Sequence, residues 1–304
     1  GAFGARIDLL LKNKKGEYVV FDLKWSYSKD YADKLEENTS IQLELYRQAM
    51  VRVNEIMAMG TGAAEIKSGY GLTVEDELKM LRVIRRIKET TPLTVKANFL
   101  GAHAVGRAYK GRQAEYVDLV CNEMLPRVAE EGLADFVDVF CDTGFFTVEE
   151  TDRMLFAGMQ NGLIPKIHAN ELDYSGGIQV GVKYNALSVD HLECVGEKEI
   201  ECLKASQTMP TILPGAAFFL NMPYSPARKM IQAGLPIAMA SDFNPGSSPS
   251  GNMQMVLTFA CVNYKLTPQE AINATTINSA YAMGISDTHG SIARGKKANF
   301  YITK

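Results

Sequence analysis

Residues with hydrolytic chemistry follow short apolar runs in the second half of the chain. His168 and Glu171 come after one run, His191 comes after the next, and Asp242 closes a later one. Histidine and aspartate are common metal ligands, and a glutamate beside them can carry protons for a metal-activated water. In a parallel sheet the strand ends share one edge, so these four residues predict a metal-assisted hydrolase site there.

Each of these residues taken alone also has an ordinary interpretation. His168 and His191 could be hydrogen-bonded histidines without a ligand, and Asp242 could belong to a surface turn. His191 has a further functional interpretation as a general base, because the pKa of histidine lies near neutrality. Asn244, in the turn after Asp242, could offer its amide to a substrate. The common position of these residues after apolar runs favours the site over the separate ordinary interpretations.

Two earlier segments occupy corresponding positions after apolar runs. Residues 67–72 contain glycines and Tyr70, and residues 100–104 contain a glycine and His103. Glycine lets the backbone approach a ligand, and the two ring side chains add directional polar groups, so Tyr70 and His103 are candidate substrate-binding residues. Neither segment has the glycine spacing of a phosphate-binding loop. His289 lies in a turn far from any predicted strand end and is expected to be structural or solvated.

The elements that must position these residues alternate between strands and helices from about residue 53 onward. Amphipathic spacing marks the helices, and apolar runs mark the strands between them. The alternation favours right-handed βα units and a parallel sheet, either open or closed into a barrel. Strands are expected at 62–66, 94–100, 136–140, 164–168, 186–189, 208–213 and 236–240, and helices at 74–87, 115–129, 147–159 and 225–233.

The two ends of the chain depart from this alternation. Residues 6–11 and 18–24 predict a β-hairpin around a turn at 13–16, and a helix is expected from Ser40. Short segments around glycines after residue 290 predict a small β segment at the other end.

Composition predicts an ordinary soluble α/β protein. With 304 residues, of which 46% are hydrophobic and 22% charged, the chain can bury a sizeable core. A net charge of -3 gives no overall attraction to nucleic acid or to membranes, and no apolar run is long enough to span a bilayer. Five cysteines without a CxxC pair indicate reduced thiols in the cytoplasm rather than a cysteine-based zinc site.

Six segments together resemble one enzyme family. On these motifs residues 51–304 resemble the imidazolonepropionases, which are metal-dependent amidohydrolases. The segments are EIKSGYGL at 65–72, FLGAHA at 99–104, KIHA at 166–169, DHL at 190–192, LPGAAFFL at 213–220 and DFNPGS at 242–247.

The resemblance implies an α/β fold, a TIM-like (β/α) barrel of the amidohydrolase type. It implies hydrolytic opening of the ring of 4-imidazolone-5-propanoate to N-formimino-L-glutamate in histidine degradation. His168 and Asp242 would be ligands of zinc or iron, Glu171 would contact the metal-bound water or the substrate, and His191 would act as base.

The resemblance also implies how the substrate is held and where the enzyme works. Tyr70, His103 and Asn244 would bind the imidazolone propionate. A cytoplasmic homodimer that acts on this small molecule, without a membrane or nucleic-acid partner, is the expected form.

The chain departs from the family pattern at its metal ligands. The first barrel strand, with its His-x-His pair, has no counterpart, and no His-x-His occurs in the sequence. Asn170 and Asn299 stand where aspartates are usual, and Gly106 stands where a proline is usual. We therefore expect a barrel that lacks its first strand, binds metal weakly and has impaired activity, with a catalytically dead relic as the alternative. The unpaired sheet edge could be covered by the N-terminal hairpin or by another subunit.

Residues 1–50 resemble a second family, the PD-(D/E)xK nucleases. Asp8, Asp22, Lys24, Gln42 and Tyr46 fit the order of residues in that family. The resemblance implies acidic groups that hold Mg²⁺ and a lysine that stabilises developing charge, hence a DNA nuclease module. An ordinary hairpin with charged faces is the alternative. The expected organisation is a nuclease-like fragment at 1–50, a barrel at 51–285 and a β segment at 286–304.

Overall fold

A computed structural model describes residues 9–12, 18–21 and 39–300, with side chains from residue 49 onward. The chain divides into two compact units, Gly1–Val51 and Arg52–Lys304. Asp8, Asp22 and Lys24 of the nuclease-like pattern lie outside the described residues, as do the side chains of Gln42 and Tyr46.

The first unit contains the predicted antiparallel strand pair. Strand β1 (Leu9–Lys12) pairs with β2 (Tyr18–Phe21), with Leu9 opposite Phe21. Helix α2 (Thr39–Ala58) begins where the sequence predicts it and continues into the second unit. The boundary between the units therefore falls inside one helix.

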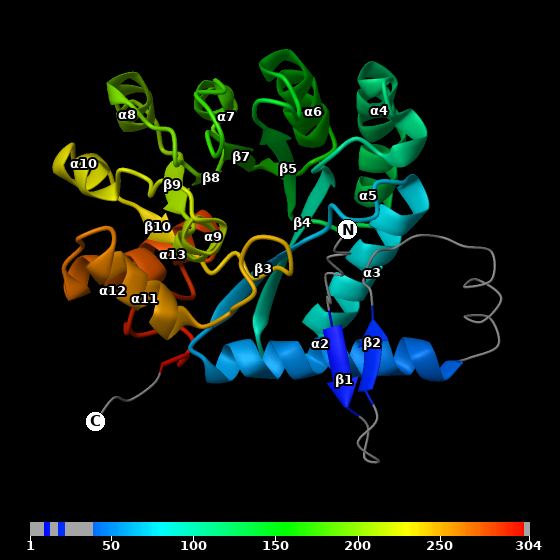
Figure 1. Ribbon diagram of the computed structural model, residues 1–304, viewed down its shortest axis with the longest axis horizontal. Helices are drawn as coiled ribbons and strands as arrows, with labels where there is room; N and C mark the ends of the chain where they lie inside the picture. Colours follow the sequence, from blue (N-terminus) through cyan, green and yellow to red (C-terminus); the bar gives the residue numbers. More distant parts are fainter. Residues whose placement is uncertain (1–8, 13–17, 22–38, 301–304) are drawn as a thin grey trace, which may run out of the picture. The chain divides into compact units, whose positions relative to one another are not determined.

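The second unit is built on a curled parallel sheet, as predicted (Figure 1). Its strands follow the chain in the order β3, β4, β5, β7, β8, β9 and β10, each parallel to the next. Strand β6 pairs only with β5. The strands are β3 (Ala63–Lys67), β4 (Thr94–Ala102), β5 (Phe136–Cys141), β6 (Ile164–Pro165), β7 (Ile167–Ala169), β8 (Ser188–His191), β9 (Met209–Ile212) and β10 (Ala238–Met239).

The strand expected at 164–168 is divided into β6 and β7. Pro165 has no N–H to donate to a ladder, and the strand pairing is interrupted at Lys166. Lys166 N still donates to Val137 O at 2.8 Å, so the chain stays beside β5 across the interruption.

Helices connect the strands and lie around the outside of the sheet (Figure 1). Thr73 and Thr147 cap two of them with their side-chain oxygens, which explains why those helices start where they do. The helices are α3 (Val74–Thr90), α4 (Gln113–Leu119), α5 (Leu125–Glu130), α6 (Val148–Gln160), α7 (Gly177–Lys183), α8 (Glu197–Lys204), α9 (Pro214–Leu220) and α10 (Ala227–Gln232), followed by α11 (Met253–Val262), α12 (Pro268–Thr275) and α13 (Ile277–Ala282). The short helices are η1 (Arg107–Tyr109) and the π-helix η2 (Val120–Met124), which joins α4 to α5.

Glycines reveal which face of the sheet the helices cover. A Cβ added to Gly158 of α6 would lie 2.4 Å from Val137 Cγ1, and one added to Gly181 of α7 would lie 3.0 Å from both Ile167 and Val189. The helices therefore pack directly on these apolar residues. Because side chains alternate along a strand, the intervening residues of β5, β7 and β8 point to the opposite, inner face.

The sheet is open within the described residues. Strands β3 and β10 form its two ends and do not pair with each other. This arrangement agrees with the expected TIM-like barrel that lacks its first strand.

The expected β segment at 286–304 is wrong for its described part. Residues 286–300 form turns and contain no strand. Side-chain bonds attach this segment to the sheet in place of a ladder: Asn299 Nδ2 donates to Gly62 O, and Lys297 Nζ donates to Thr94 Oγ1, both at 3.0 Å. His289 is buried and lies 3.1 Å from Thr94 Oγ1, which agrees with a structural role.

Within the described residues, no helix combines the length and apolar character that crossing a membrane requires. All five cysteines are free thiols, and Cys141 is buried.

Glu77 fixes the loop that leads out of β3. Its carboxylate is fully buried and accepts hydrogen bonds from Gly69 N at 2.9 Å, Gly71 N at 2.8 Å and Leu72 N at 2.9 Å. Gly69 has a φ of 109°, a conformation that favours glycine. One side chain of α3 therefore determines the course of the loop that carries Tyr70.

Glu77→Ala should lower the free energy of unfolding by about 3 kcal/mol, because it leaves buried backbone donors without an acceptor. Urea titration followed by circular dichroism measures the change. Glu89→Ala, at an exposed position near the end of the same helix, is the matched control and should stay within about 0.5 kcal/mol of the parent. Equal losses in the two variants would contradict the role given to Glu77.

Candidate active site

Four of the predicted site residues lie in one row of aromatic rings at the carboxyl ends of the strands. Ring centroids are 5.2 Å apart for Tyr70 and His103, and 6.1 Å apart for His103 and Phe140. The row continues from Phe140 to His168 at 6.1 Å and from His168 to His191 at 5.2 Å. The structure thus brings together Tyr70, His103, His168 and His191, which come from four separate segments.

His168 lies near the end of β7, and its ring contacts a carboxylate on the neighbouring strand. It is 6% exposed, and its Nδ1 lies 2.9 Å from Asp138 Oδ1 on the neighbouring strand β5. Burial alone would lower the pKa of His168, but the charge of Asp138 raises it above the usual value. With Nδ1 bonded to Asp138, Nε2 is the ring atom that remains for a ligand.

Glu171 lies in the turn that leaves β7. The turn is fixed by Asp142, whose Oδ2 accepts from Glu171 N at 2.8 Å and from Leu172 N at 2.9 Å. Burial, with the charges of Asp242 and Asp142, raises the pKa of Glu171 to about 7 against the opposing effect of His168. A carboxyl group with this pKa can both take up and release a proton at neutral pH.

Asn170, which departs from the family pattern, is used structurally in this turn. It is fully buried; its Nδ2 donates to Cys194 O at 2.8 Å, and its Oδ1 accepts from Ser175 Oγ at 3.1 Å.

His191 ends β8 in a left-handed backbone conformation. Its φ is 86° and that of Leu192 is 69°, values that cost energy for residues with a Cβ. Ser225 Oγ donates to His191 O at 2.9 Å and helps to hold this conformation. His191 Nδ1 has no hydrogen-bond partner among the described residues; Glu171 Oε2 lies 3.5 Å away and Glu193 Oε2 3.9 Å away. Burial and the nearby charge of His168 lower the pKa of His191 to about 3, so the ring is neutral at pH 7.

Asp242 also has a left-handed backbone, with a φ of 50°. Burial raises the pKa of its carboxyl group, while the charge of His168 and a bond from Ser247 Oγ at 3.1 Å lower it. Burial and the charge of Asp242 raise the pKa of Tyr70. Asp242 is thus electrostatically coupled to both His168 and Tyr70.

Asn244 uses its amide inside the turn. Its Nδ2 donates to Asp242 O and Ser247 Oγ, both at 2.7 Å, and its Oδ1 accepts from Gly246 N and Ser247 N, both at 2.8 Å. Its role in substrate binding stays a prediction, and the bonds present give it a role in shaping the turn.

Tyr70 and His103 differ in how far their side chains are exposed to solvent. Tyr70 is 48% exposed, whereas His103 is mostly buried beside it. The carbonyl of Gly69 can only accept, so His103 Nδ1, at 3.1 Å, donates to it and leaves Nε2 as an acceptor.

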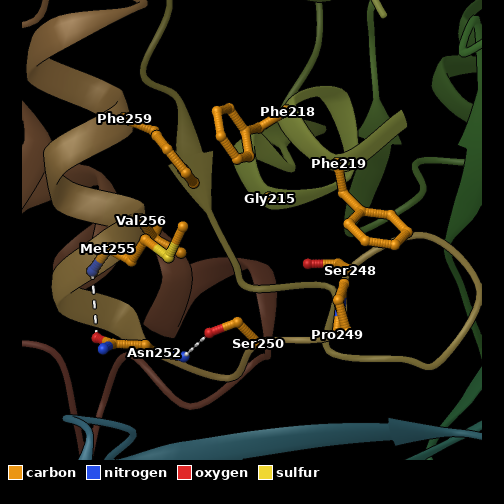
Figure 2. A pocket seen from close by; sticks show the side chains of 10 residues that line it. All are labelled: Gly215, Phe218, Phe219, Ser248, Pro249, Ser250, Asn252, Met255, Val256 and Phe259. Carbon is orange, nitrogen blue, oxygen red and sulfur yellow. Dashed lines mark hydrogen bonds between the residues drawn. The ribbon is translucent and has the colours of Figure 1, made fainter. Parts of the chain in front are cut away.

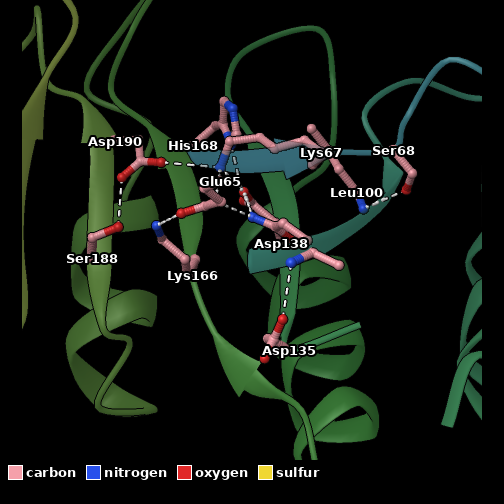
Figure 3. A network of polar contacts seen from close by, with 12 residues as sticks. Glu65, Lys67, Ser68, Leu100, Asp135, Asp138, Lys166, His168, Ser188 and Asp190 are labelled. Atoms are coloured by element: carbon pink, nitrogen blue, oxygen red, sulfur yellow. Dashed lines mark hydrogen bonds and ion pairs between the residues drawn. The ribbon is translucent and has the colours of Figure 1, made fainter. Parts of the chain in front are cut away.

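A cluster of charged strand residues beside His168 was not identified from the sequence (Figure 3). The sequence does contain a pattern that indicates this cluster. A polar residue recurs at alternate positions of otherwise apolar strands, as in Glu65 with Lys67 and Ser188 with Asp190. We call this group the ion cluster; its members are Glu65, Lys67, Asp138, Lys166, His168 and Asp190.

Glu193 was also missed. It is 7% exposed, and neither of its carboxylate oxygens has a hydrogen-bond partner among the described residues. Burial and the charge of Glu171 raise the pKa of Glu193 to about 9, so it holds a proton at pH 7. The site therefore contains two adjacent carboxyl groups of raised pKa, Glu171 and Glu193.

The residues present fit a metal ion in part. Ligand atoms of Asp138, His168 and Asp190 lie within 4.8 Å of one another. The predicted pair, His168 and Asp242, offers two ligands, and a catalytic zinc normally has about three from the protein.

A separate pocket of about 90 Å³ lies between α9, α11 and the loop that follows β10 (Figure 2). Phe218 stacks on Phe259 there, with centroids 4.5 Å apart. Its lining contains none of the predicted site residues. The lining residues are Gly215, Phe218, Phe219, Ser248, Pro249, Ser250, Asn252, Met255, Val256 and Phe259.

The chain is similar to known amidohydrolases. The family model "Amidohydrolase family" matches residues 166–304. Imidazolonepropionase of Flavobacterium johnsoniae is 58% identical over 273 residues, which are 90% of this chain and 66% of the relative. Imidazolonepropionase of Geobacillus kaustophilus is 43% identical over 258 residues, 85% of this chain and 61% of the relative. The chain thus spans slightly less than two thirds of the relatives that it matches.

The fold is also found in solved structures. A variant of atrazine chlorohydrolase TrzN from Arthrobacter aurescens superposes with a TM-score of 0.63 at 12% identity, over 91% of this chain and 69% of that one. This likeness confirms the fold alone.

The first fifty residues are partly included in the match. Because 273 of 304 residues align with the F. johnsoniae relative, the similarity begins upstream of residue 51, earlier than the sequence motifs predict. These comparisons give no support to the nuclease resemblance.

Glu193→Gln should flatten the dependence of stability on pH. The folded protein keeps a proton on Glu193 that the unfolded chain releases near the ordinary pKa of 4.5, so stability falls as pH rises from there towards 9. Glutamine cannot ionise, and the variant should lose less stability than the parent between pH 5 and pH 8 in urea titrations. Glu197→Gln, at an exposed position four residues on, is the control. Parallel losses in the parent and Glu193→Gln would refute a buried, protonated Glu193.

Proposed function

We propose that this chain hydrolyses 4-imidazolone-5-propanoate to N-formimino-L-glutamate. The premise is that the chain belongs to the imidazolonepropionases of the amidohydrolase family over most of its length. The observation that carries the proposal is the convergence of His168, Glu171 and His191 at one edge of the sheet, with a pKa of about 7 on Glu171. Ring hydrolysis at neutral pH needs a group there that exchanges protons with water.

The proposed metal ligands are His168, through Nε2, and Asp242. Zinc or iron is the proposed metal, because the relatives belong to a family of metal-dependent hydrolases and the donors are a nitrogen and a carboxylate. When bound, such an ion lowers the pKa of water to about 7 and so supplies hydroxide. The bond from Asp138 supports the orientation of His168 in this role.

The remaining residues are proposed to move protons and to hold the substrate. Glu171 takes a proton from water and returns it to the leaving ring nitrogen, for which a pKa near 7 is suited. His191 is neutral at pH 7 and accepts a hydrogen bond or a proton as charge develops. Tyr70 and His103 border the same space and are proposed to hold the substrate, with Asn244 shaping the turn beside them.

Residues 51–285 are proposed as the catalytic body, since all of these side chains lie within it. A reducing compartment such as the cytoplasm suits the free cysteines. A homodimer is proposed as the working form, and sedimentation velocity at micromolar concentration would test it; the half-exposed Phe218 and Phe219 are apolar surface that a second subunit could bury.

Metal loading and turnover test the function directly. We expect this chain, incubated with Zn²⁺ or Fe²⁺ and then desalted, to retain less than one metal per chain, because only two ligands are assigned. Slow loss of imidazolone absorbance should accompany the bound metal. Turnover that is absent with every metal would favour the catalytically dead alternative.

Glu171→Gln should reduce kcat by about 100-fold or more with little change in metal content, since it removes proton transfer without removing a ligand. Glu149→Gln, an exposed glutamate on α6, serves as control and should keep the parental kcat. If Glu171→Gln were as active as Glu149→Gln, the proton-carrying role would be excluded.

A further inference from the structure

Lys67 places a positive charge inside the ion cluster (Figure 3). Its Nζ donates to Glu65 Oε1 at 2.6 Å, to Asp138 Oδ2 at 2.9 Å and to Asp190 Oδ2 at 3.3 Å. The Asp138 side chain is fully buried and that of Asp190 nearly so. Buried carboxylates require a compensating charge, and Lys67 supplies it to both.

Asp138 has both oxygens engaged. Oδ2 accepts from Lys67 Nζ and, at 2.8 Å, from Asn98 Nδ2, while Oδ1 lies 2.9 Å from His168 Nδ1. Because the Lys67 ammonium and the Asn98 amide both donate to Oδ2, Oδ1 is left to accept from His168 Nδ1. In its neutral form the His168 ring therefore carries its proton on Nδ1, and Nε2 has a lone pair.

We propose that Lys67 is a positioning residue for metal binding, acting through Asp138 to hold His168 with Nε2 directed to a metal shared with Asp242. This role rests on the proposed function, because it concerns a ligand of that site. It also assigns Asp138 and Asp190 as supports for His168. Their spacing alone would allow them to hold an ion directly with His168.

Removing the charge of Lys67 should change the affinity for zinc in opposite directions, depending on whether Lys67 positions His168 or competes with a metal ion. If Lys67 positions His168, Lys67→Met should weaken zinc binding by about 10–100-fold, the usual effect of losing a group that orients a ligand. If Asp138, His168 and Asp190 hold the ion themselves, Lys67→Met should bind zinc more tightly, because a competing cation is gone. Competition with a chromophoric chelator measures the affinity, and Lys67→Arg should recover most of it.

A second measurement works without metal and without activity. In the metal-free protein at pH 9, ¹⁵N–¹H spectra of the imidazoles should assign the Nδ1–H tautomer to His168. Lys67→Met and Asp138→Asn should shift His168 towards the Nε2–H tautomer, because the acceptor for Nδ1 is released or weakened. Lys166→Met is the control: this lysine lies in the same cluster and is more deeply buried than Lys67, but it bonds Glu65, and its loss should leave the tautomer unchanged.

These results separate the failure of this inference from the failure of the proposed hydrolase. An inactive chain that still shows the tautomer shift supports Lys67 as a positioning residue. Tighter zinc binding by Lys67→Met, or an unchanged tautomer in both Lys67→Met and Asp138→Asn, overturns it. If Lys67→Met fails to fold by circular dichroism, Lys67→Gln and Asp138→Asn carry the same test.

Discussion

The structure of the site depends on the burial of charge between parallel strands. Asp138 and Asp190 are nearly inaccessible, and the positive charges of Lys67 and Lys166 lie within the same group. Such a cluster is stable only when every charge has a partner, and removing one partner is more costly than never having had the pair. The helices on the outer face supply the apolar burial, and the inner face is left to polar residues that orient His168.

Much of the fold could be predicted because the sequence alternates clearly between apolar strands and amphipathic helices. Leu78, Leu81, Ile84 and Ile87 are all buried on one side of α3, as their spacing predicts. The end of the chain could not be predicted in this way. Residues 286–300 contain glycines and short apolar stretches that are typical of strands, but their attachment by Asn299 and Lys297 side chains to other parts of the chain is not visible in a local pattern.

The positions of His168 and His191 at the ends of their strands could be predicted, because residue type and strand position coincide there. Lys67, Asp138 and Glu193 were missed because their importance comes from what surrounds them rather than from their position along the chain. Asp138 is one polar residue in an apolar strand, and only the packing of β5 against β7 places it on His168 Nδ1. The role of Asn244 is likewise set by contacts, since the four hydrogen bonds of its side chain are all made inside its own turn.

His191, Leu192 and Asp242 adopt left-handed backbone conformations, each of which costs about 1–3 kcal/mol for a residue with a side chain. Glycine would relax the backbone at His191 and Asp242 but would remove the side chains that are proposed to carry the chemistry. Selection for stability and selection for chemistry therefore act in opposite directions at these two positions.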